Sequence, residues 1–318
     1  MTNLEVKPEL LNCESSNYST QVLKPRSITL TTRSGIKVDR LLPNASLRMI
    51  GAWCFLDHFL PQDNEEIMSV AAHPHTGLQT VTWLFSGEVK HHDSLGSNQV
   101  IQPGELNLMT AGRGISHSEV SNKDKSPLHG VQLWVALDEK SRNINPKFNH
   151  YADLPVVETD SFKARIIIGE MFGVVSKALA FSPLVAAEIT FSTDSIVEIA
   201  LDESFEYGFM PVNNVVQVSS QEIQIGELYY QSRGAEKIEI RARADSKILL
   251  IGGAPFEEEI LMWWNFVARS HEEIEQMREL WQAKSEIFGE VADEINERIP
   301  APSLPSIKLK PRANKKLG

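Results

Sequence analysis

A short internal repeat limits the fold of this chain most strongly. The segment QPGELNLMTAGRG at residues 102–114 is matched by QIGELYYQSRG at residues 224–234, with an offset of 122 residues between the two QxGEL blocks. Each block opens a run of residues that we interpret as a β-strand. A repeat of this kind predicts two copies of one β-fold in a single chain.

The other apolar runs agree with two all-β domains. Short runs such as QTVTWLF and GVQLWVAL are separated by Gly, Pro, Asn and Asp, and similar runs resume at FKARIIIGE and continue to SKILLIGG. Such spacing is typical of a β-sandwich or a β-barrel. A chain of 318 residues is also long for a single core. We therefore predict an all-β protein with two domains.

Changes in composition predict where the domains begin and end. The first residues are polar and rich in Ser, Asn and Thr, the segment DEKSRNINPKFNHYADLP is polar and contains Pro, and the last residues are basic and rich in Pro. We expect a flexible N-terminal arm at residues 1–21, a first domain at 22–137, a linker at 138–155, a second domain with a helix at 156–290, and a flexible basic tail at 291–318.

The helix is predicted by a capping box near the end of the chain. Ser270 and Glu273 have the S-x-x-E spacing in which each side chain can bond the backbone of the other residue. Residues at helical spacing follow, namely Ile274, Met277, Trp281, Lys284 and Phe288.

Charge and cysteine content exclude several classes of protein. The formal net charge of −11 disfavours binding to nucleic acid or to an anionic membrane. No run of 18 apolar residues is present, and the first 20 residues have no apolar core of a secretory signal. Cys13 and Cys54 are too few for a disulfide framework. We expect a soluble cytoplasmic protein.

Two pairs of polar residues predict a metal site. The segments HPHTGLQ and ISHSEV place His73 with His75 and His117 with Glu119, each pair separated by one residue. On a β-strand such residues point to the same face. If the two strands are neighbours, four metal-ligand side chains converge on one point. Six of the nine histidines lie between residues 58 and 117, which adds support.

The donor types indicate the class of metal. Three imidazoles and one carboxylate suit a first-row transition metal better than calcium or magnesium, which prefer oxygen ligands. Four protein ligands in an octahedral shell would leave two positions for dioxygen and a chelating substrate. Zinc in a tetrahedral structural site is the alternative.

The second copy is expected to hold no metal. The offset of the repeat places Glu239 and Arg241 where the first copy has His117 and Glu119. No histidine stands between residues 150 and 271. A multi-histidine site is therefore expected in the first copy only.

The segment HPHTGLQTVTWLFSGEVKHHDSLGSNQVIQPGELNLMTAGRGISHSE at residues 73–119 closely resembles the N-terminal signature of the pirin family, within the cupin superfamily. A weaker resemblance extends over roughly residues 25–285. It implies a bicupin, with two antiparallel β-barrels face to face and a C-terminal helix packed back on the fold. It also implies one metal in the N-terminal barrel, usually iron, bound by His73, His75, His117 and Glu119. Nickel, manganese, cobalt, copper or zinc would also suit these ligands.

Three residues depart from the pirin pattern, and one of them is Asp39, which replaces one of the consecutive arginines that the family often has there. Gln79 stands where pirins typically have Glu, the position from which many other cupins supply a metal-binding carboxylate. His92 stands where Arg is more usual. Adjacent residues on a strand face opposite ways, so at most one of His91 and His92 can face the barrel interior. We interpret His92 as a surface residue of a hairpin.

The resemblance implies two different functions. The first is a metal-dependent dioxygenase that acts on a flavonol such as quercetin, with Glu119 as the base that accepts the hydroxyl proton. The second is a regulatory protein that senses metal or redox state and acts through protein partners. Both would use the same ligands. We expect the enzyme, and the sequence leaves the second function open.

Overall fold

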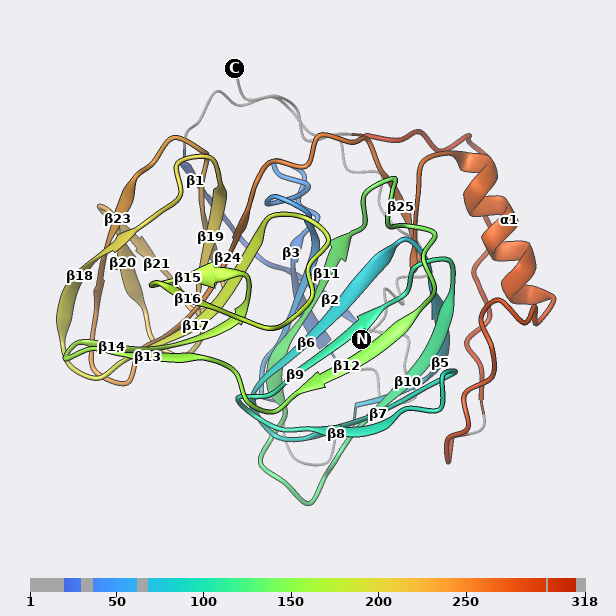
Figure 1. Ribbon diagram of the computed structural model, residues 1–318, viewed down its shortest axis with the longest axis horizontal. Helices are drawn as coiled ribbons and strands as arrows, with labels where there is room; N and C mark the ends of the chain where they lie inside the picture. The colour runs from blue at the N-terminus through green and yellow to red at the C-terminus, as the bar shows by residue number, and fades with distance from the viewer. Residues whose placement is uncertain (1–19, 30–36, 62–67, 296, 313–318) are drawn as a thin grey trace.

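The structure, a computed structural model, describes residues 20–29, 37–61, 68–295 and 297–312. Two β-domains lie side by side (Figure 1). Residues 1–19 of the expected arm and residues 313–318 of the expected tail lie outside the described residues.

The first domain contains a seven-stranded sheet and a four-stranded sheet. The larger sheet has the order β12 (Lys147–Tyr151), β9 (Leu106–Thr110), β6 (Leu78–Ser86), β11 (His129–Ala136), β4 (Trp53–Phe59), β3 (Lys37–Leu42) and β2 (Arg26–Thr29). The smaller sheet has the order β5 (Ser69–His75), β10 (Ile115–Ser121), β7 (Val89–Asp93) and β8 (Asn98–Ile101). All of these neighbouring strands pair antiparallel.

The second domain also contains a seven-stranded sheet and a four-stranded sheet. Its larger sheet has the order β1 (Thr20–Leu23), β22 (Leu228–Gln231), β19 (Glu206–Pro211), β24 (Lys247–Gly253), β17 (Leu184–Phe191), β14 (Phe162–Ile168) and β13 (Val156–Glu158). Its smaller sheet has the order β18 (Ser195–Ala200), β23 (Lys237–Ala242), β20 (Val216–Val218) and β21 (Gln221–Ile223). A hairpin of β15 (Glu170–Met171) and β16 (Val174–Val175) lies outside these sheets.

The matching strand orders confirm the two-copy prediction. The repeated QxGEL blocks form the same turn in both domains. The backbone N–H of Gln102 donates to Glu105 Oε2 at 2.9 Å, and that of Gln224 donates to Glu227 Oε2 at 3.0 Å. The turns lead into β9 and β22, which occupy equivalent places in the two larger sheets.

Two edge strands come from segments that composition assigned to an arm and a linker. Thr20 and Gln21 belong to β1, which pairs with β22 and completes the larger sheet of the second domain. Residues 147–151 form β12, which pairs with β9 and completes the larger sheet of the first domain. Each domain therefore takes one edge strand from a segment outside its own run of strands.

The two larger sheets pack against each other across a shared apolar core. Trp53 Nε1 donates to the carbonyl of Gly252 at 3.0 Å, and Trp83 Nε1 donates to Glu188 Oε2 at 2.8 Å. Buried residues from both sheets fill the layer between them, among them Val81, Leu108, Leu133 and Val135 from the first domain and Ile167, Leu184, Met210 and Leu249 from the second.

The interiors of the two domains differ in chemistry. The core of the second domain is an apolar cluster that includes Ile189, Phe209, Val218, Ile240 and Leu250. In the first domain, polar residues separate two apolar clusters. Along β4, Asp57 lies between Phe55 of one cluster and Phe59 of the other. Buried polar groups are costly unless they are paired. A polar band inside one domain only therefore requires a functional reason.

The C-terminal helix begins as the sequence predicts. The helix α1 (His271–Gln282) has Ser270 as its N-cap, and the Ser270 hydroxyl accepts from the backbone N–H of Glu273. The prediction that the helix continues to Lys284 and Phe288 is wrong, because the helix ends at Gln282 and Lys284 adopts φ 54°. The helix lies against the first domain, on the side away from the second domain (Figure 1).

The chain around the helix also packs on the first domain. Before it lies a hairpin of β25 (Leu261–Trp263) and β26 (Phe266–Ala268). Residues 297–312, which composition assigned to a flexible tail, form isolated bridges through Arg298 to Ala72 and through Arg312 to Ile260. Within the described residues, no helix has both the length and the hydropathy needed to span a membrane.

Replacing the N-cap tests how much the helix start contributes to stability. We expect Ser270→Ala to lower the free energy of unfolding by about 1 kcal/mol, because one backbone N–H of the first turn loses its acceptor. Chemical denaturation of the full chain measures this change. The exposed Ser303→Ala is the control and should change stability by less than about 0.5 kcal/mol. Equal effects in both variants would contradict the capping role.

Candidate metal centre

Two neighbouring strands carry the four residues that the sequence singled out. Strands β5 and β10 pair so that His117 lies directly opposite His73. The register shifts between His117 and Glu119, which is a β-bulge of the kind often found beside functional sites. The three histidines are 0% exposed and Glu119 is 1% exposed. The pairing thus brings both pairs of polar residues into the interior of the first domain.

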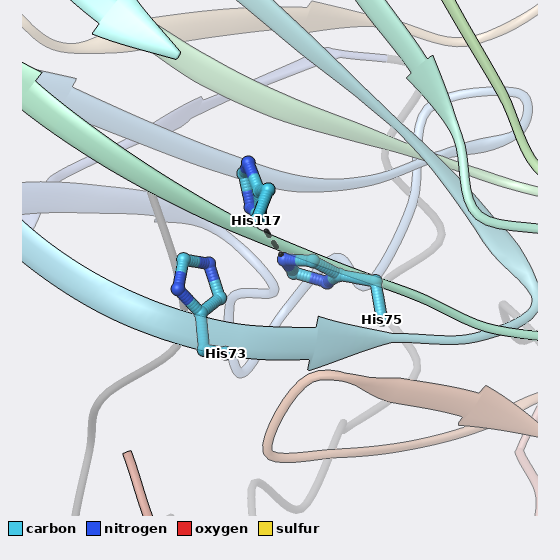
Figure 2. Close-up of side chains that lie close together, drawn as sticks. All are labelled: His73, His75 and His117. Atoms are coloured by element: carbon cyan, nitrogen blue, oxygen red, sulfur yellow. Dashed lines mark hydrogen bonds between the residues drawn. The ribbon is translucent and has the colours of Figure 1, made fainter. Parts of the chain in front are cut away.

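Three histidine nitrogens form one compact set. One ring nitrogen from each of His73, His75 and His117 lies within 4.8 Å of the other two, and the three rings gather on one side of their strands (Figure 2). His75 Nε2 and His117 Nε2 are 3.1 Å apart. Two nitrogens bound at right angles to one metal at ~2.1 Å would be ~3 Å apart. The spacing of this pair therefore suits ligands of a single ion.

His73 has a ring nitrogen that the protein leaves without a partner. Its Nδ1 lies 2.8 Å from the carbonyl oxygen of Ala71, so Nδ1 carries the proton and donates to that oxygen. Its Nε2 is buried and has no hydrogen-bond partner. An unpaired acceptor in the interior is costly, and coordination of a cation would remove that cost. The residues present therefore fit a metal ion.

Burial keeps these histidines in the form that binds metals. It lowers the pKa of His73 to about 3 and holds the pKa values of His75 and His117 well below their usual range. The three imidazoles are therefore neutral at physiological pH. Neutral imidazole is the species that coordinates transition metals.

Glu119 belongs to a second set. A carboxylate oxygen of Glu119 lies within 4.8 Å of ring nitrogens of His117 and His91, not in the set of three histidines. The Thr82 hydroxyl donates to Glu119 Oε1 at 3.4 Å. The four predicted residues thus share one interior, with three imidazoles grouped tightly and the carboxylate beside them.

His91 is the residue of this interior that the sequence did not assign to the site. It lies opposite Glu119 in the pairing of β7 with β10 and is 2% exposed. Its ring stacks on Phe148 of β12, with centroids 4.4 Å apart. The signal in the sequence was the spacing of His91 and Asp93, which is the same i, i+2 spacing as in the two predicted ligand pairs.

The expectation of a surface position for His92 is wrong. His92 faces away from the interior, as its neighbour His91 requires, but it is only 8% exposed. The segment after α1 covers this face of β7, since Lys90 pairs with Glu294 at 4.0 Å and the charge of Asp293 acts on the His92 ring.

Gln79 points away from the candidate site. Its Nε2 donates to Thr110 Oγ1 at 2.9 Å and to the carbonyl of Leu179 in the second domain at 3.1 Å. The side chain therefore joins the two domains. The direction of the Gln79 side chain, rather than the chemistry of its amide group, excludes it as a metal ligand.

The second domain carries apolar residues where the first carries histidines. The expectation that Glu239 and Arg241 take the places of His117 and Glu119 is wrong, because both side chains are exposed on the outer face of β23. Ile238 and Ile240 face the interior instead. Among the described residues, the groups of side chains that could hold a metal lie in the first domain.

The C-terminal segment bonds to a neighbour of each of the three histidines. Next to His73, Ala72 exchanges backbone hydrogen bonds with Glu297 and Ile299; next to His75, Thr76 accepts from the N–H of Val267; and next to His117, the Ser116 hydroxyl donates to the carbonyl of Phe288. The chain after residue 260 thus fixes the backbone from which these side chains project.

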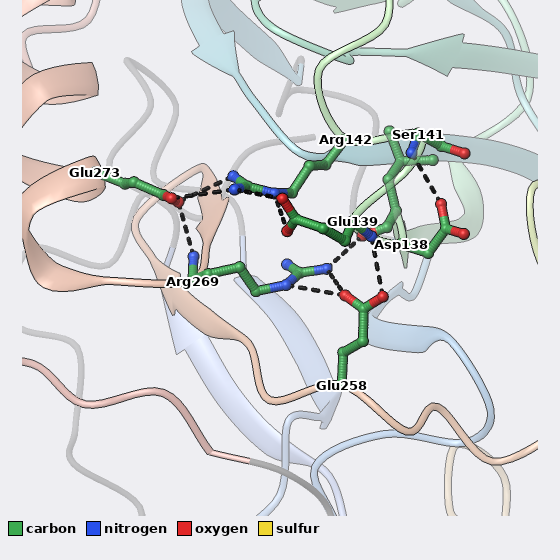
Figure 3. A network of polar contacts seen from close by, with 8 residues as sticks. Asp138, Glu139, Ser141, Arg142, Glu258, Arg269 and Glu273 are labelled. Carbon is green, nitrogen blue, oxygen red and sulfur yellow. Dashed lines mark hydrogen bonds and ion pairs between the residues drawn. The ribbon is translucent and has the colours of Figure 1, made fainter.

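A polar network anchors this segment to the first domain. Arg142 donates to both Glu139 and Glu273, and Arg269 donates to Glu258 and to the carbonyl of Leu137 (Figure 3). The network connects the start of α1 with the chain that follows β11. These charges are partly exposed, so their main effect is geometric rather than energetic.

Two cupin domains in one chain, of which one contains a buried histidine cluster, define a bicupin. Residues 35–135 match the family model described as Pirin, and residues 186–286 match the model described as Pirin C-terminal cupin domain. The chain belongs to the pirin family. This result confirms the resemblance seen in the sequence and the all-β fold with two cupin domains.

Three relatives illustrate how far the similarity extends. The crystal structure of a quercetin 2,3-dioxygenase from Acinetobacter baumannii is 42% identical and superimposes with a TM-score of 0.86 over 93% of this chain and 98% of that chain. The Pseudomonas aeruginosa protein PA1205, whose name provisionally designates it a quercetin 2,3-dioxygenase, is 41% identical over 273 residues, 85% of this chain and 87% of that protein. A pirin-like protein of Caulobacter vibrioides is 36% identical over 258 residues, 78% of this chain and 88% of that protein.

A pair of glycine variants tests the contact between the C-terminal segment and the turn that follows β5. Gly77 has φ +70°, and an added Cβ would lie 2.1 Å from the carbonyl oxygen of Val267. Gly96 has φ +87° and open space around it. We expect Gly96→Ala to cost roughly 1–2 kcal/mol of unfolding free energy from backbone strain alone. We expect Gly77→Ala to cost about 1–3 kcal/mol more, because Val267 must move. Equal losses in chemical denaturation would show that this contact is not tight.

Proposed function

We propose that this protein is a metal-dependent dioxygenase that acts on flavonols such as quercetin. The observation that carries the proposal is the buried set of three neutral histidines, one with an unpartnered nitrogen, beside a buried carboxylate. The names of the Acinetobacter baumannii and Pseudomonas aeruginosa relatives support the reaction, since both similarities extend over most of the chain.

His73, His75 and His117 would hold the metal, with Glu119 as an adjacent or fourth ligand. Iron is the first expectation, and nickel, manganese, cobalt, copper or zinc would also suit three imidazoles. When bound, the metal would supply the Lewis-acid and redox chemistry that lets dioxygen react with an electron-rich ring.

The protein itself would supply a base and a dry environment. In the proposed mechanism, Glu119 accepts the proton of the flavonol 3-hydroxyl group at a carboxylate oxygen. Glu119 lies beside the three-histidine set. A carboxylate in that position is a better base than one bound tightly to the metal, because a metal-bound carboxylate is a weak base. The Thr82 hydroxyl lies 3.4 Å from Oε1 of that carboxylate and 3.1 Å from Gln132 Oε1. The stacked rings of Phe55 and Trp134, 4.0 Å apart, form an apolar wall beside His75 that excludes water.

Removing one histidine tests the metal site. We expect the wild-type chain to bind one equivalent of transition metal and His75→Ala to lose most of it, because two imidazoles cannot replace the set of three. Elemental analysis of the purified full chain gives the stoichiometry. His150→Ala removes a histidine of β12 that bonds Asn107, and it should keep one equivalent. Full metal content in His75→Ala would rule out this ligand set. If the wild-type chain binds two equivalents and His75→Ala keeps one of them, the second metal is bound elsewhere.

Replacing the carboxylate separates chemistry from metal binding. Glu119→Gln keeps the size of the side chain and one oxygen donor but cannot take up the hydroxyl proton. We expect flavonol oxidation per bound metal to fall by about 10²–10⁴ while metal content changes far less. Oxygen consumption and metal content are measured on the same sample, and the exposed Glu239→Gln is the control.

Two results would contradict the enzyme. If Glu119→Gln oxidises flavonols at the wild-type rate per bound metal, Glu119 is not the base. If the wild-type chain, loaded in turn with each of the candidate metals, consumes no oxygen with flavonols, the site serves metal or redox sensing through protein partners instead.

A further inference from the structure

A chain of hydrogen bonds runs from the candidate metal centre to a buried carboxylate. His117 Nδ1 lies 3.3 Å from His91 Nδ1, and His91 Nε2 lies 3.1 Å from Asp93 Oδ2. The other oxygen of Asp93, Oδ1, accepts from the backbone N–H groups of Leu95 at 2.9 Å and Ser97 at 3.1 Å. His91, Asp93 and His117 are each 2% exposed or less.

When each imidazole carries one proton, the direction of every hydrogen bond in this series follows from the acceptor at its end. An ionised carboxylate can only accept, so His91 Nε2 carries a proton and donates it to Asp93. With a single ring proton, on Nε2, His91 has a lone pair at Nδ1, which can only accept. His117 Nδ1 must therefore carry a proton and donate it to His91. The lone pair of His117 is left on Nε2, the nitrogen that faces His75.

We propose that Asp93 and His91 are positioning residues that fix the tautomer of His117 and so prepare its Nε2 for the metal. This inference rests on the proposed metal site and adds to it two residues that bind no metal themselves. Ligating histidines commonly donate their second N–H to a carboxylate or carbonyl, and loss of that partner typically weakens metal binding about 10–100-fold. Here a second imidazole stands between the ligand and the carboxylate.

One substitution in this protein would reverse the direction of these hydrogen bonds without removing any side chain. In Asp93→Asn, the two backbone N–H groups of Leu95 and Ser97 require the amide oxygen at the position of Oδ1. The amide NH₂ must then face His91 Nε2, which becomes an acceptor. His91 Nδ1 carries the proton and donates it to His117 Nδ1. The proton of His117 moves to Nε2, where it blocks coordination.

The tautomers can be read directly in the full-length chain. In metal-free protein labelled with ¹⁵N-histidine, long-range ¹H–¹⁵N correlation spectra show which ring nitrogen of His117 is protonated. His117→Gln identifies its signals. We expect protonation at Nδ1 in the wild type and at Nε2 in Asp93→Asn. Zinc affinity, measured by competition with a chromophoric chelator, should fall about 10–100-fold in Asp93→Asn.

Two further variants separate this role from general stability. His91→Phe keeps an aromatic ring against Phe148 but removes the acceptor, and its zinc affinity should also fall about 10–100-fold. His92→Gln changes the neighbouring residue of β7, which faces outward, and it should leave both the His117 tautomer and the zinc affinity unchanged. Thermal unfolding of each metal-free variant shows whether the fold is retained.

Several outcomes would overturn the inference. It fails if His117 of the wild type is protonated at Nε2, or if Asp93→Asn keeps the wild-type tautomer and affinity. It also fails if zinc shifts the His91 Nδ1 signal in the manner of a bound nitrogen, because His91 would then be a ligand. A wild-type chain that binds no metal would overturn the proposed function, whereas the metal-free spectra would still decide the tautomer.

Discussion

The antiparallel pairing of β5 with β10 is the contact on which the candidate centre depends. It sets His117 opposite His73, and strand alternation in β10 places Glu119 at the next inward position of the same interior. Because side chains alternate along a strand, a slip of one residue in this register would turn one pair of polar side chains outward. The C-terminal segment bonds to Ala72, Thr76 and Ser116, so it restrains the same register from outside the sheet.

The interior of the first domain contains polar residues around this centre where the second domain has apolar ones. Along β6, Thr80 and Thr82 lie between Leu78 and Leu84, whereas the inward residues Tyr207 and Phe209 of the equivalent β19 belong to an apolar cluster. Part of the polar band is paired, since Thr82 Oγ1 bonds Gln132 Oε1 and Arg40 forms a bidentate pair with Asp57. Such pairs offset part of the cost of burial and hold their side chains in one geometry.

The sequence was sufficient where the inference needed only local geometry. The spacing of His73 with His75 and of the QxGEL turns depends on strand alternation and turn chemistry, and both are visible in a few residues. It was insufficient where an answer depended on how strands meet. Glu239 and Arg241 share the offset of the repeat, but a change of one residue in a connection reverses which side chains face inward. The i, i+2 spacing of His91 and Asp93 indicates a strand, but it does not reveal that this strand, β7, pairs with β10 and so brings His91 into the site.

The second domain has a physical role even without ligands of its own. The larger sheet of the first domain presents Trp53, Val81 and Trp83 on the face opposite the histidines, and the second domain buries that face. Strands β6 and β11 therefore have apolar packing on their outer face while their inner face carries Thr82 and Gln132. An apolar second copy supplies stability that a polar copy would not, since each buried aliphatic or aromatic side chain contributes about 1.5–3 kcal/mol. The two domains thus share a strand order but not a chemistry.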